Sequence, residues 1–315
     1  MNLQGWRRIP VPKTIIFLAE YFIFRWFIFF LTALPLNIVI SLVKNLARLI
    51  YNIDWRYKKI AVENILLANP PIVSSDSQAN ELALHSYEHF ALSFAHILYA
   101  KRFNRLKSRK YVHLENSEII DNALKKNKGV LLVGAHLGNW EICITELGKQ
   151  GYPINLVAFQ YVNPYLNNMM NRFRLDCGVT IIPTKGAISK CEEALKKGEI
   201  VIMLIDQTGR DAGVEAQFFG RIAPAMWGSA NLSLKTGATI IPFGIYHRPD
   251  PIIQSSQSAI HYTAKFSNMI NYQPTGNKDD DIKKLTQIYL NEIEKIIRRA
   301  PEQWIWFHRR WKKYK

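Results

Sequence analysis

The chain has 315 residues, of which 48% are hydrophobic and 12% aromatic, so it is not a disordered basic tail and has enough material for one large domain or two small ones. Its 41 basic residues outnumber its 25 acidic ones, and the net charge of +16 indicates an acidic partner, either nucleic acid, anionic lipid or an acidic protein. The three cysteines show no pattern, which favours a reducing compartment and no disulfide framework.

The amino-terminal region is strongly apolar. Residues 14–34 are interrupted only by Glu20 and Arg25, and residues 36–50 continue the apolar pattern. Because a charge at the centre of a spanning helix costs about 2.5–3.5 kcal/mol, a tilted span and an in-plane helical hairpin both remain open. The run is too long for the apolar core of a cleaved signal peptide. We therefore expect residues 1–50 to be helices that associate with a membrane.

A helical, basic region is expected next, over residues 51–118. Within it, a helix over residues 81–99 places His85, His89 and His96 on one side. Two histidines four residues apart can bind zinc, but no third ligand is suitably spaced. We therefore expect a polar stripe here and no metal site.

Residues 101–110 contain six basic side chains, with Phe103 and Leu106 interleaved. A solvated charged face is the usual structure for such a run. The apolar segment upstream leaves a second possibility open, namely a face that binds lipid headgroups or phosphate.

From residue 119 onward, helical and extended patterns alternate, which predicts an α/β fold with a mixed, mostly parallel central sheet flanked by helices. The expected strands are 129–135, 154–159, 179–182, 200–205, 239–246 and an edge strand at 260–266. The expected helices are 119–128, 166–177, 188–197, 229–235 and 278–299. We divide the chain into 1–50, 51–118 and an α/β catalytic domain at 119–315, with 51–315 folding as one unit.

The first of these strands ends at His136, where open α/β sheets place their sites. Gly138 and Asn139 supply a turn and a helix N-cap, and Glu141 follows in the first helical turn. Because the turn lets the chain reverse, the Glu141 carboxylate could reach the His136 ring, hold one nitrogen protonated and leave the other as a general base. The simpler alternative is that Glu141 complements the helix dipole and His136 is a loop histidine.

Further blocks follow this one in order along the chain. They lie at 171–174 (Asn-Arg-Phe-Arg), 206–209 (Asp-Gln-Thr-Gly), 218–220 (Phe-Phe-Gly), 236–242 and 301–312, the last beginning Pro-Glu-Gln-Trp. Together with the apolar amino terminus, these blocks closely resemble the bacterial lipid A biosynthesis acyltransferases, the lauroyl and myristoyl transferases of the lysophospholipid acyltransferase superfamily. The resemblance covers nearly the whole chain.

The resemblance implies roles for individual residues. His136 and Glu141 match the catalytic pair of the family, Arg172 matches the arginine of the helix block, and Asp206 matches the aspartate of a D-x-D-like block. Here Thr208 stands where some members carry the second acidic residue, which puts a joint role of two carboxylates in doubt.

The resemblance also implies the substrates and the location. Members transfer an acyl chain from acyl carrier protein to a hydroxyl of a lipid A precursor, at the cytoplasmic face of the bacterial inner membrane and without a cofactor or metal. The expected partners are therefore acyl carrier protein, the lipid A precursor and anionic membrane lipids, and not nucleic acid.

This chemistry fits the residue types. A histidine with a pKa near 6.5 can take the proton from the attacking lipid hydroxyl. Backbone N–H groups of Gly138 and Asn139, or the Arg172 guanidinium, would contact the oxyanion. We expect Asp206 to fix Arg172 or another basic group.

Three other functions remain open. The same fold could act on a different acceptor, such as a phosphatidylinositol mannoside or an amino-acid lipid. A membrane-bound thioester or ester hydrolase could use the same residues on water. A basic protein that only binds lipid or nucleic acid would not need His136.

Overall fold

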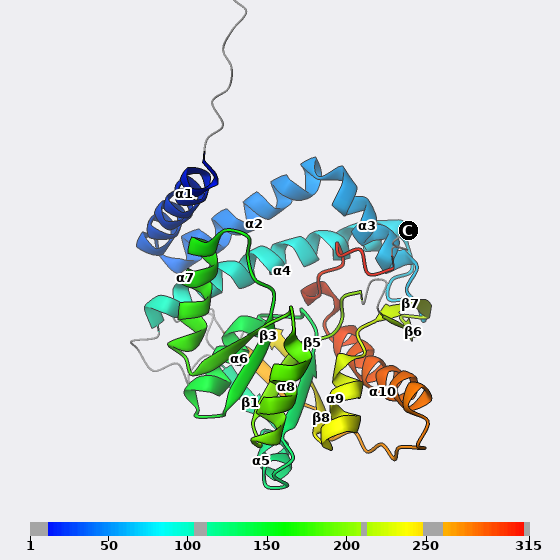
Figure 1. The fold of residues 1–315 in the computed structure, drawn as a ribbon. Helices are drawn as coiled ribbons and strands as arrows, with labels where there is room; N and C mark the ends of the chain where they lie inside the picture. Colours follow the sequence, from blue (N-terminus) through cyan, green and yellow to red (C-terminus); the bar gives the residue numbers. More distant parts are fainter. Residues whose placement is uncertain (1–11, 104–111, 209–212, 248–260, 312–315) are drawn as a thin grey trace, which may run out of the picture.

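A computed structural model describes residues 12–103, 112–208, 213–247 and 261–311, and its centre is a seven-stranded sheet (Figure 1). The strand order is β1-β9-β8-β2-β5-β3-β4, and all neighbouring pairs are parallel except β8 and β9. The mixed, mostly parallel sheet is thus confirmed. The strands are β1 (Val112–Glu115), β2 (Val130–Gly134), β3 (Ile154–Ala158), β4 (Val179–Pro183), β5 (Ile200–Leu204), β8 (Thr239–His247) and β9 (Tyr262–Phe266).

Helices cover both faces of the sheet. Along β2, Leu131 and Val133 belong to one core cluster and Val130 and Leu132 to the other, because successive strand residues point to opposite faces. The first face packs against α8 (Ala187–Lys196), α9 (Gly228–Thr236) and α10 (Lys278–Arg298), and the second against α5 (Glu118–Leu124) and α6 (Trp140–Lys149). This burial on both faces explains why the strands are continuous apolar runs.

The remaining helices lie around the end of the sheet where the parallel strands finish, most of them along the top of Figure 1 and the last one descending at the left beside the sheet. They are α1 (Lys13–Ala33), α2 (Leu36–Ile53), α3 (Trp55–Leu66), α4 (Asp76–Phe103) and α7 (Pro164–Leu175). The helix α2 packs along α4, and α1 contacts both α4 and α7. The amino-terminal helices are therefore part of the structure around this end of the sheet.

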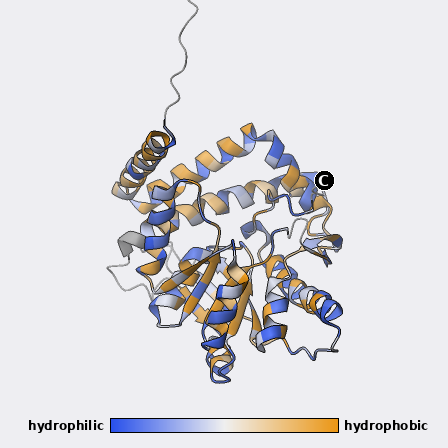
Figure 2. Ribbon diagram, in the orientation of Figure 1, coloured by the Kyte–Doolittle hydropathy of each residue, from blue (hydrophilic) through white to orange (hydrophobic). Residues whose placement is uncertain are grey.

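The helix α2 has two apolar faces. One is buried against α4, whereas the other is open, and Figure 2 shows how much of α1 and α2 is hydrophobic. The buried face consists of Val39, Val43, Ala47 and Tyr51. The open face consists of Ile38, Leu42, Leu46, Leu49 and Ile53. Both α1 and α2 are long and apolar enough to cross a membrane by length and composition.

Some predicted elements differ from the observed ones. The strand β9 lies inside the sheet and not at its edge, because β1, which is only four residues long and was not predicted, covers it. A separate antiparallel hairpin of β6 (Val214–Phe218) and β7 (Arg221–Ala225) was also missed. In the helical region expected from residue 51 onward, α2 ends before Asp54 and α3 begins after it, and the Asp54 side chain accepts from the Tyr57 N–H at 3.2 Å.

Two predictions remain untested. The basic stretch 101–110 lies almost entirely outside the described residues. The division into 1–50, 51–118 and 119–315 stays a prediction, and its two boundaries fall inside α2 and α5.

Candidate active site

The His136 side chain contacts Asp206 at the carboxyl ends of two neighbouring parallel strands. The strands β2 and β5 pair in register with Gly134 opposite Leu204, so the positions two residues beyond them are also opposite. The Nδ1 atom of His136 lies 2.8 Å from Oδ1 of Asp206, and the backbone N–H of His136 donates to Oδ2 at 3.1 Å. The sheet therefore joins two residues that are 70 positions apart in the chain.

The charge of Asp206 decides the protonation of the ring. Burial alone would raise the pKa of this carboxyl, but the charge of His136 and the hydrogen bonds from His136 and Trp304 outweigh burial and hold the pKa below its usual value. An ionised carboxylate only accepts hydrogen bonds, so Nδ1 of His136 carries the proton. The Nε2 atom of neutral His136 is then free to accept one. The His136 side chain keeps 22% of its surface exposed, whereas that of Asp206 is fully buried.

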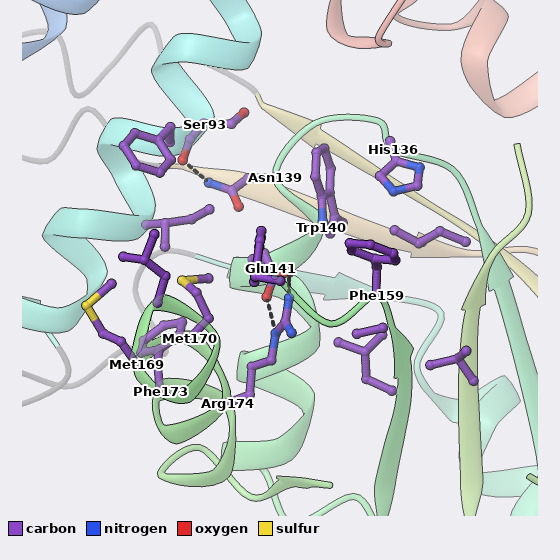
Figure 3. Close-up of a pocket in the computed structure, with 18 of the residues that line it drawn as sticks. Ser93, His136, Asn139, Trp140, Glu141, Phe159, Met169, Met170, Phe173 and Arg174 are labelled. Atoms are coloured by element: carbon purple, nitrogen blue, oxygen red, sulfur yellow. Dashed lines mark hydrogen bonds and ion pairs between the residues drawn. The ribbon is translucent and has the colours of Figure 1, made fainter. Parts of the chain in front are cut away.

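The carboxylate at the ring thus belongs to Asp206, which corrects the predicted contact between Glu141 and His136. Glu141 turns to α7, where the Arg174 Nε–H donates to its Oε2 at 3.0 Å and the Arg174 Nη2 group donates to Oε1. Both side chains are almost fully buried. The physical reason is the direction of the first turn of α6: Figure 3 shows Glu141 pointing toward Arg174 and away from His136.

Arg172 is not among the residues that line the pocket, and its predicted part in binding substrate or oxyanion stays a prediction. Arg172 is exposed, whereas Arg174, two residues along the same helix, lines the pocket and holds Glu141. Residues two apart on a helix point about 200° apart, so only one of the two can face the site. Asp206 therefore fixes His136 and not Arg172.

The turn between β2 and α6 is tightly held. Gly138 has φ +61°, and a Cβ there would meet the carbonyl oxygen of Ile245 at 2.2 Å. Its N–H donates to the Gln303 carbonyl at 3.1 Å, so it is already used and is no free donor for an oxyanion. The Asn139 side chain accepts from the Ile142 N–H at 3.2 Å, which confirms the predicted N-cap. Ser93 of α4 accepts a hydrogen bond from the Asn139 amide at its carbonyl and donates its hydroxyl to the Gly138 carbonyl.

A pocket of about 580 Å³ opens beside His136 (Figure 3). This volume lies in the range of small-molecule sites, and the lining is mostly apolar. The walls come from α1, α4, β3, α6 and α7, so the amino-terminal helix forms part of the pocket. Apolar wall residues include Phe24, Ile28, Phe94, Phe159, Met170 and Phe173. Such a pocket suits a long alkyl chain that ends near a base.

The three histidines predicted to lie on one side of α4 have two different environments. His85 is exposed, whereas His89 and His96 are buried close to His247. Burial, followed by the charge of His247, lowers the pKa of His89 to about 3 and lowers that of His96 as well. The Nδ1 atom of His96 lies 2.7 Å from the Tyr262 hydroxyl. Within the described ranges, no three His, Cys, Asp or Glu side chains converge as metal ligands would.

Sequence reasoning missed three contacts of this site. The Asp206–His136 pair could have been found from two apolar strands that each end in a polar residue, had the strand order been known. The role of Arg174 was obscured by Arg172 in the same block. Trp304 was noted only as part of the carboxy-terminal block, and its indole N–H donates to Oδ2 of Asp206 at 2.8 Å.

Comparison with known proteins shows which family the chain belongs to. Residues 10–313 match the family model described as bacterial lipid A biosynthesis acyltransferase. The chain belongs to this family. Similar proteins include the lipid A biosynthesis lauroyltransferase of Escherichia coli (strain K12), which is 24% identical over 89% of this chain and 87% of that protein. The lipid A biosynthesis palmitoleoyltransferase of the same organism is 25% identical over 82% of this chain and 79% of its own length.

More distant similarities extend the comparison. A phosphatidylinositol mannoside acyltransferase of Mycobacterium tuberculosis is 26% identical, but over only 39% of this chain and 40% of that protein. The solved structure of the 1-acyl-sn-glycerophosphate acyltransferase PlsC from Thermotoga maritima covers 82% of this chain and 98% of its own, at 13% identity and a TM-score of 0.35. At that TM-score the likeness carries no argument about function.

Proposed function

We propose that the protein transfers a fatty acyl chain from a thioester on acyl carrier protein to a hydroxyl of a lipid A precursor. The observation that carries this proposal is the mostly apolar pocket of about 580 Å³ with His136 in its wall, held by a buried aspartate. Membership in the family supports acyl transfer on a lipid. The net charge of +16 fits two acidic partners, a phosphorylated lipid and an acidic carrier protein.

In the proposed reaction His136 acts as general base and Asp206 as the group that holds it. The Nε2 atom takes the proton of the lipid hydroxyl while the hydroxyl oxygen attacks the thioester carbonyl carbon. Ionised Asp206 stabilises the imidazolium that forms. The tetrahedral intermediate then collapses, the carbon–sulfur bond breaks, and the imidazolium returns the proton to the departing thiolate. The products are the new ester and the free thiol of the carrier protein.

The developing oxyanion needs positive charge or N–H donors. The amino terminus of α6 begins at Trp140, whose ring packs edge-on against His136 with 4.9 Å between ring centroids. The first N–H groups of a helix lack partners within the helix, and its dipole favours negative charge there. We assign oxyanion stabilisation to this helix end, in place of the Gly138 N–H, which is occupied.

Glu141 and Arg174 take a different role in this proposal. Their ion pair joins α6 to α7 across the pocket wall and keeps the two helices in place. Both residues line the pocket, so the pair shapes the space for the acyl chain. Glu141 is then needed for the geometry of the site and does not exchange a proton.

The experiment that tests this function is transfer with purified components, read by mass spectrometry of the lipid. The wild-type protein with acyl carrier protein thioester and lipid A precursor is expected to add one acyl chain to the precursor. His136→Ala should abolish the product, whereas His85→Ala, which removes an exposed histidine of α4, should leave it unchanged. Release of free fatty acid in place of acylated lipid would indicate the hydrolase. Transfer to a phosphatidylinositol mannoside but not to the lipid A precursor would indicate the other acceptor.

We further propose that the protein sits at the cytoplasmic face of the inner membrane with α2 lying in the membrane plane. One face of α2 is covered by α4, so this helix cannot be surrounded by lipid as a spanning helix is. Its open side carries the apolar side chains Ile38, Leu42, Leu46, Leu49 and Ile53, with exposed Ser41, Asn45 and Asn52 along the border. An interfacial helix has this arrangement, and basic side chains near anionic headgroups add about 1 kcal/mol each.

Depth measurements test this placement. A fluorophore attached to Ile38→Cys or Ile53→Cys sits on positions that are about 22 Å apart along a helix axis. An in-plane helix predicts equal quenching of both labels by lipids that carry a quencher at a fixed depth in one leaflet only. A spanning helix predicts clearly different quenching of the two labels. Ile288→Cys on α10, at the other end of the molecule, serves as the control that should not be quenched.

A further inference from the structure

The carboxy-terminal segment after α10 returns to the active site. The short helix η3 (Pro301–Gln303) is followed by Trp304, which forms an isolated antiparallel bridge with Leu137, next to His136. The indole N–H of Trp304 donates to Oδ2 of Asp206 at 2.8 Å, whereas the His136 ring uses the other carboxylate oxygen, Oδ1. The two aromatic side chains therefore hold the same carboxylate from two sides.

Trp304 is itself fixed in place. Its side chain is 2% exposed and stacks on Phe219, with 5.6 Å between ring centroids and 20° between the planes. Its carbonyl accepts from the Ser86 hydroxyl of α4. The direction of the indole N–H is thus set by packing on one side and by the backbone on the other. A rigid donor of this kind can fix the orientation of the group that it binds.

We propose that Trp304 is a positioning residue for the acyl transfer: its indole N–H fixes the Asp206 carboxylate in the orientation that receives Nδ1–H of His136. Without Trp304, Oδ2 would keep only the backbone N–H of His136, at 3.1 Å, and the carboxylate could turn more freely about its bond to Cβ. With Oδ2 held by Trp304, Oδ1 stays directed at the ring, and Nε2 stays directed into the pocket. This inference rests on the proposed function, in which His136 is the base.

The same segment supplies a compensating charge. Arg310 is fully buried and interacts electrostatically with Asp206, and one of its Nη1 hydrogens is donated to the Pro224 carbonyl at 2.8 Å. A buried carboxylate stays ionised where donors and a positive charge surround it. The carboxy-terminal segment thus provides both the donor that orients Asp206 and a positive charge that favours its ionised form.

Replacing Trp304 by phenylalanine tests the role of the N–H, because the aromatic ring that stacks on Phe219 is kept. The matched control is Trp306→Phe, since Trp306 is equally buried and donates its indole N–H to the Pro301 carbonyl at 2.7 Å, away from Asp206. With the full-length protein, Trp304→Phe should lower kcat about tenfold or more while KM for donor and acceptor changes little. Trp306→Phe at the same folded fraction should keep kcat close to that of the wild type.

Two readouts separate positioning from a general loss of packing. Without the indole donor, the Asp206 carboxylate holds Nδ1–H of His136 less well and stabilises the imidazolium less, so the acid limb of the pH profile of kcat/KM should move to lower pH in Trp304→Phe only. In an Asp206→Asn background, Trp304→Phe should cause no further loss, because it acts through Asp206. Equal kcat for the two tryptophan variants, or losses that multiply in the double variant, would overturn the inference.

The contact can also be judged without turnover. Nitrogen NMR of isotope-labelled histidine, with the signal assigned by its loss in His136→Gln, reports which ring nitrogen carries the proton. The wild type and Trp306→Phe should show His136 protonated at Nδ1, and Trp304→Phe should show a mixture of tautomers. An unchanged tautomer in Trp304→Phe contradicts the positioning role, whatever the activity assay finds. Absence of transfer by a wild type with the expected tautomer contradicts the proposed function alone.

Discussion

Two buried carboxylates near the same pocket have different partners. Asp206 is 1% exposed and holds a histidine, and Glu141 is 6% exposed and holds Arg174. A histidine gains and loses a proton near neutral pH, whereas an arginine stays charged throughout. The first pair can therefore move a proton, and the second can only fix two helices.

The comparison shows that the spacing of a motif does not decide which carboxylate serves the histidine. Glu141 is five residues from His136 in the chain, yet its side chain follows the first turn of α6 toward α7. Asp206 is 70 residues away, yet it lies opposite His136 because β2 and β5 are paired in register. The order of strands in the sheet, and not proximity in sequence, selects the partner.

The largest effect on stability should come from breaking the Glu141–Arg174 pair. Glu141→Gln leaves the Arg174 charge buried without its partner, which is expected to lower the free energy of unfolding by about 3–5 kcal/mol. Urea unfolding followed by circular dichroism measures this. Arg174→Met should destabilise similarly, and the double variant Glu141→Gln/Arg174→Met should recover part of the loss because neither charge then remains.

The matched control for this pair is Arg172→Met. Arg172 is exposed on the same helix, so its replacement should change the free energy of unfolding by less than about 0.5 kcal/mol. A loss for Arg172→Met as large as that for Arg174→Met would mean that the ion pair is not what stabilises the contact between α6 and α7. That result would contradict the claim that Glu141 serves to hold two helices together.

A smaller effect should come from a third buried group, His89. Burial lowers its pKa in the folded protein to about 3, whereas in the unfolded chain it is 6.5. The unfolded state therefore takes up a proton first as the pH falls, and stability is lost from about pH 6.5 down to about pH 3. The loss between pH 6.5 and pH 5 is about 1.5 kcal/mol.

Unfolding measured as a function of pH tests this contribution. His89→Asn should flatten the dependence of stability on pH in this window. His85→Asn, on the exposed side of the same helix, should leave the dependence unchanged. Identical slopes for wild type and His89→Asn would show that His89 titrates normally in the folded protein.

The sequence predicted much of the fold, because buried strands and capped helices leave local signals. The strand that precedes His136 and the cap at Asn139 were found this way, since each depends on neighbouring residues. The pairing of His136 with Asp206 and the packing of α1 against the pocket depend on tertiary structure. Helix periodicity did not decide between Arg172 and Arg174, because both positions lie in one turn and the direction of the helix was unknown. The short strand β1 was missed because four residues give too little pattern.

The central claim is that Asp206, and not Glu141, holds the base. The most direct measurement is the single-turnover rate of acyl transfer for Asp206→Asn and Glu141→Gln, each corrected for its folded fraction. A positioned proton acceptor contributes a factor of roughly 10²–10⁴, so Asp206→Asn should be slower than the wild type by about that factor. Folded Glu141→Gln should stay within about tenfold of the wild type. A rate for Glu141→Gln that falls as far as, or further than, that of Asp206→Asn would contradict the account and place Glu141 at the reacting proton.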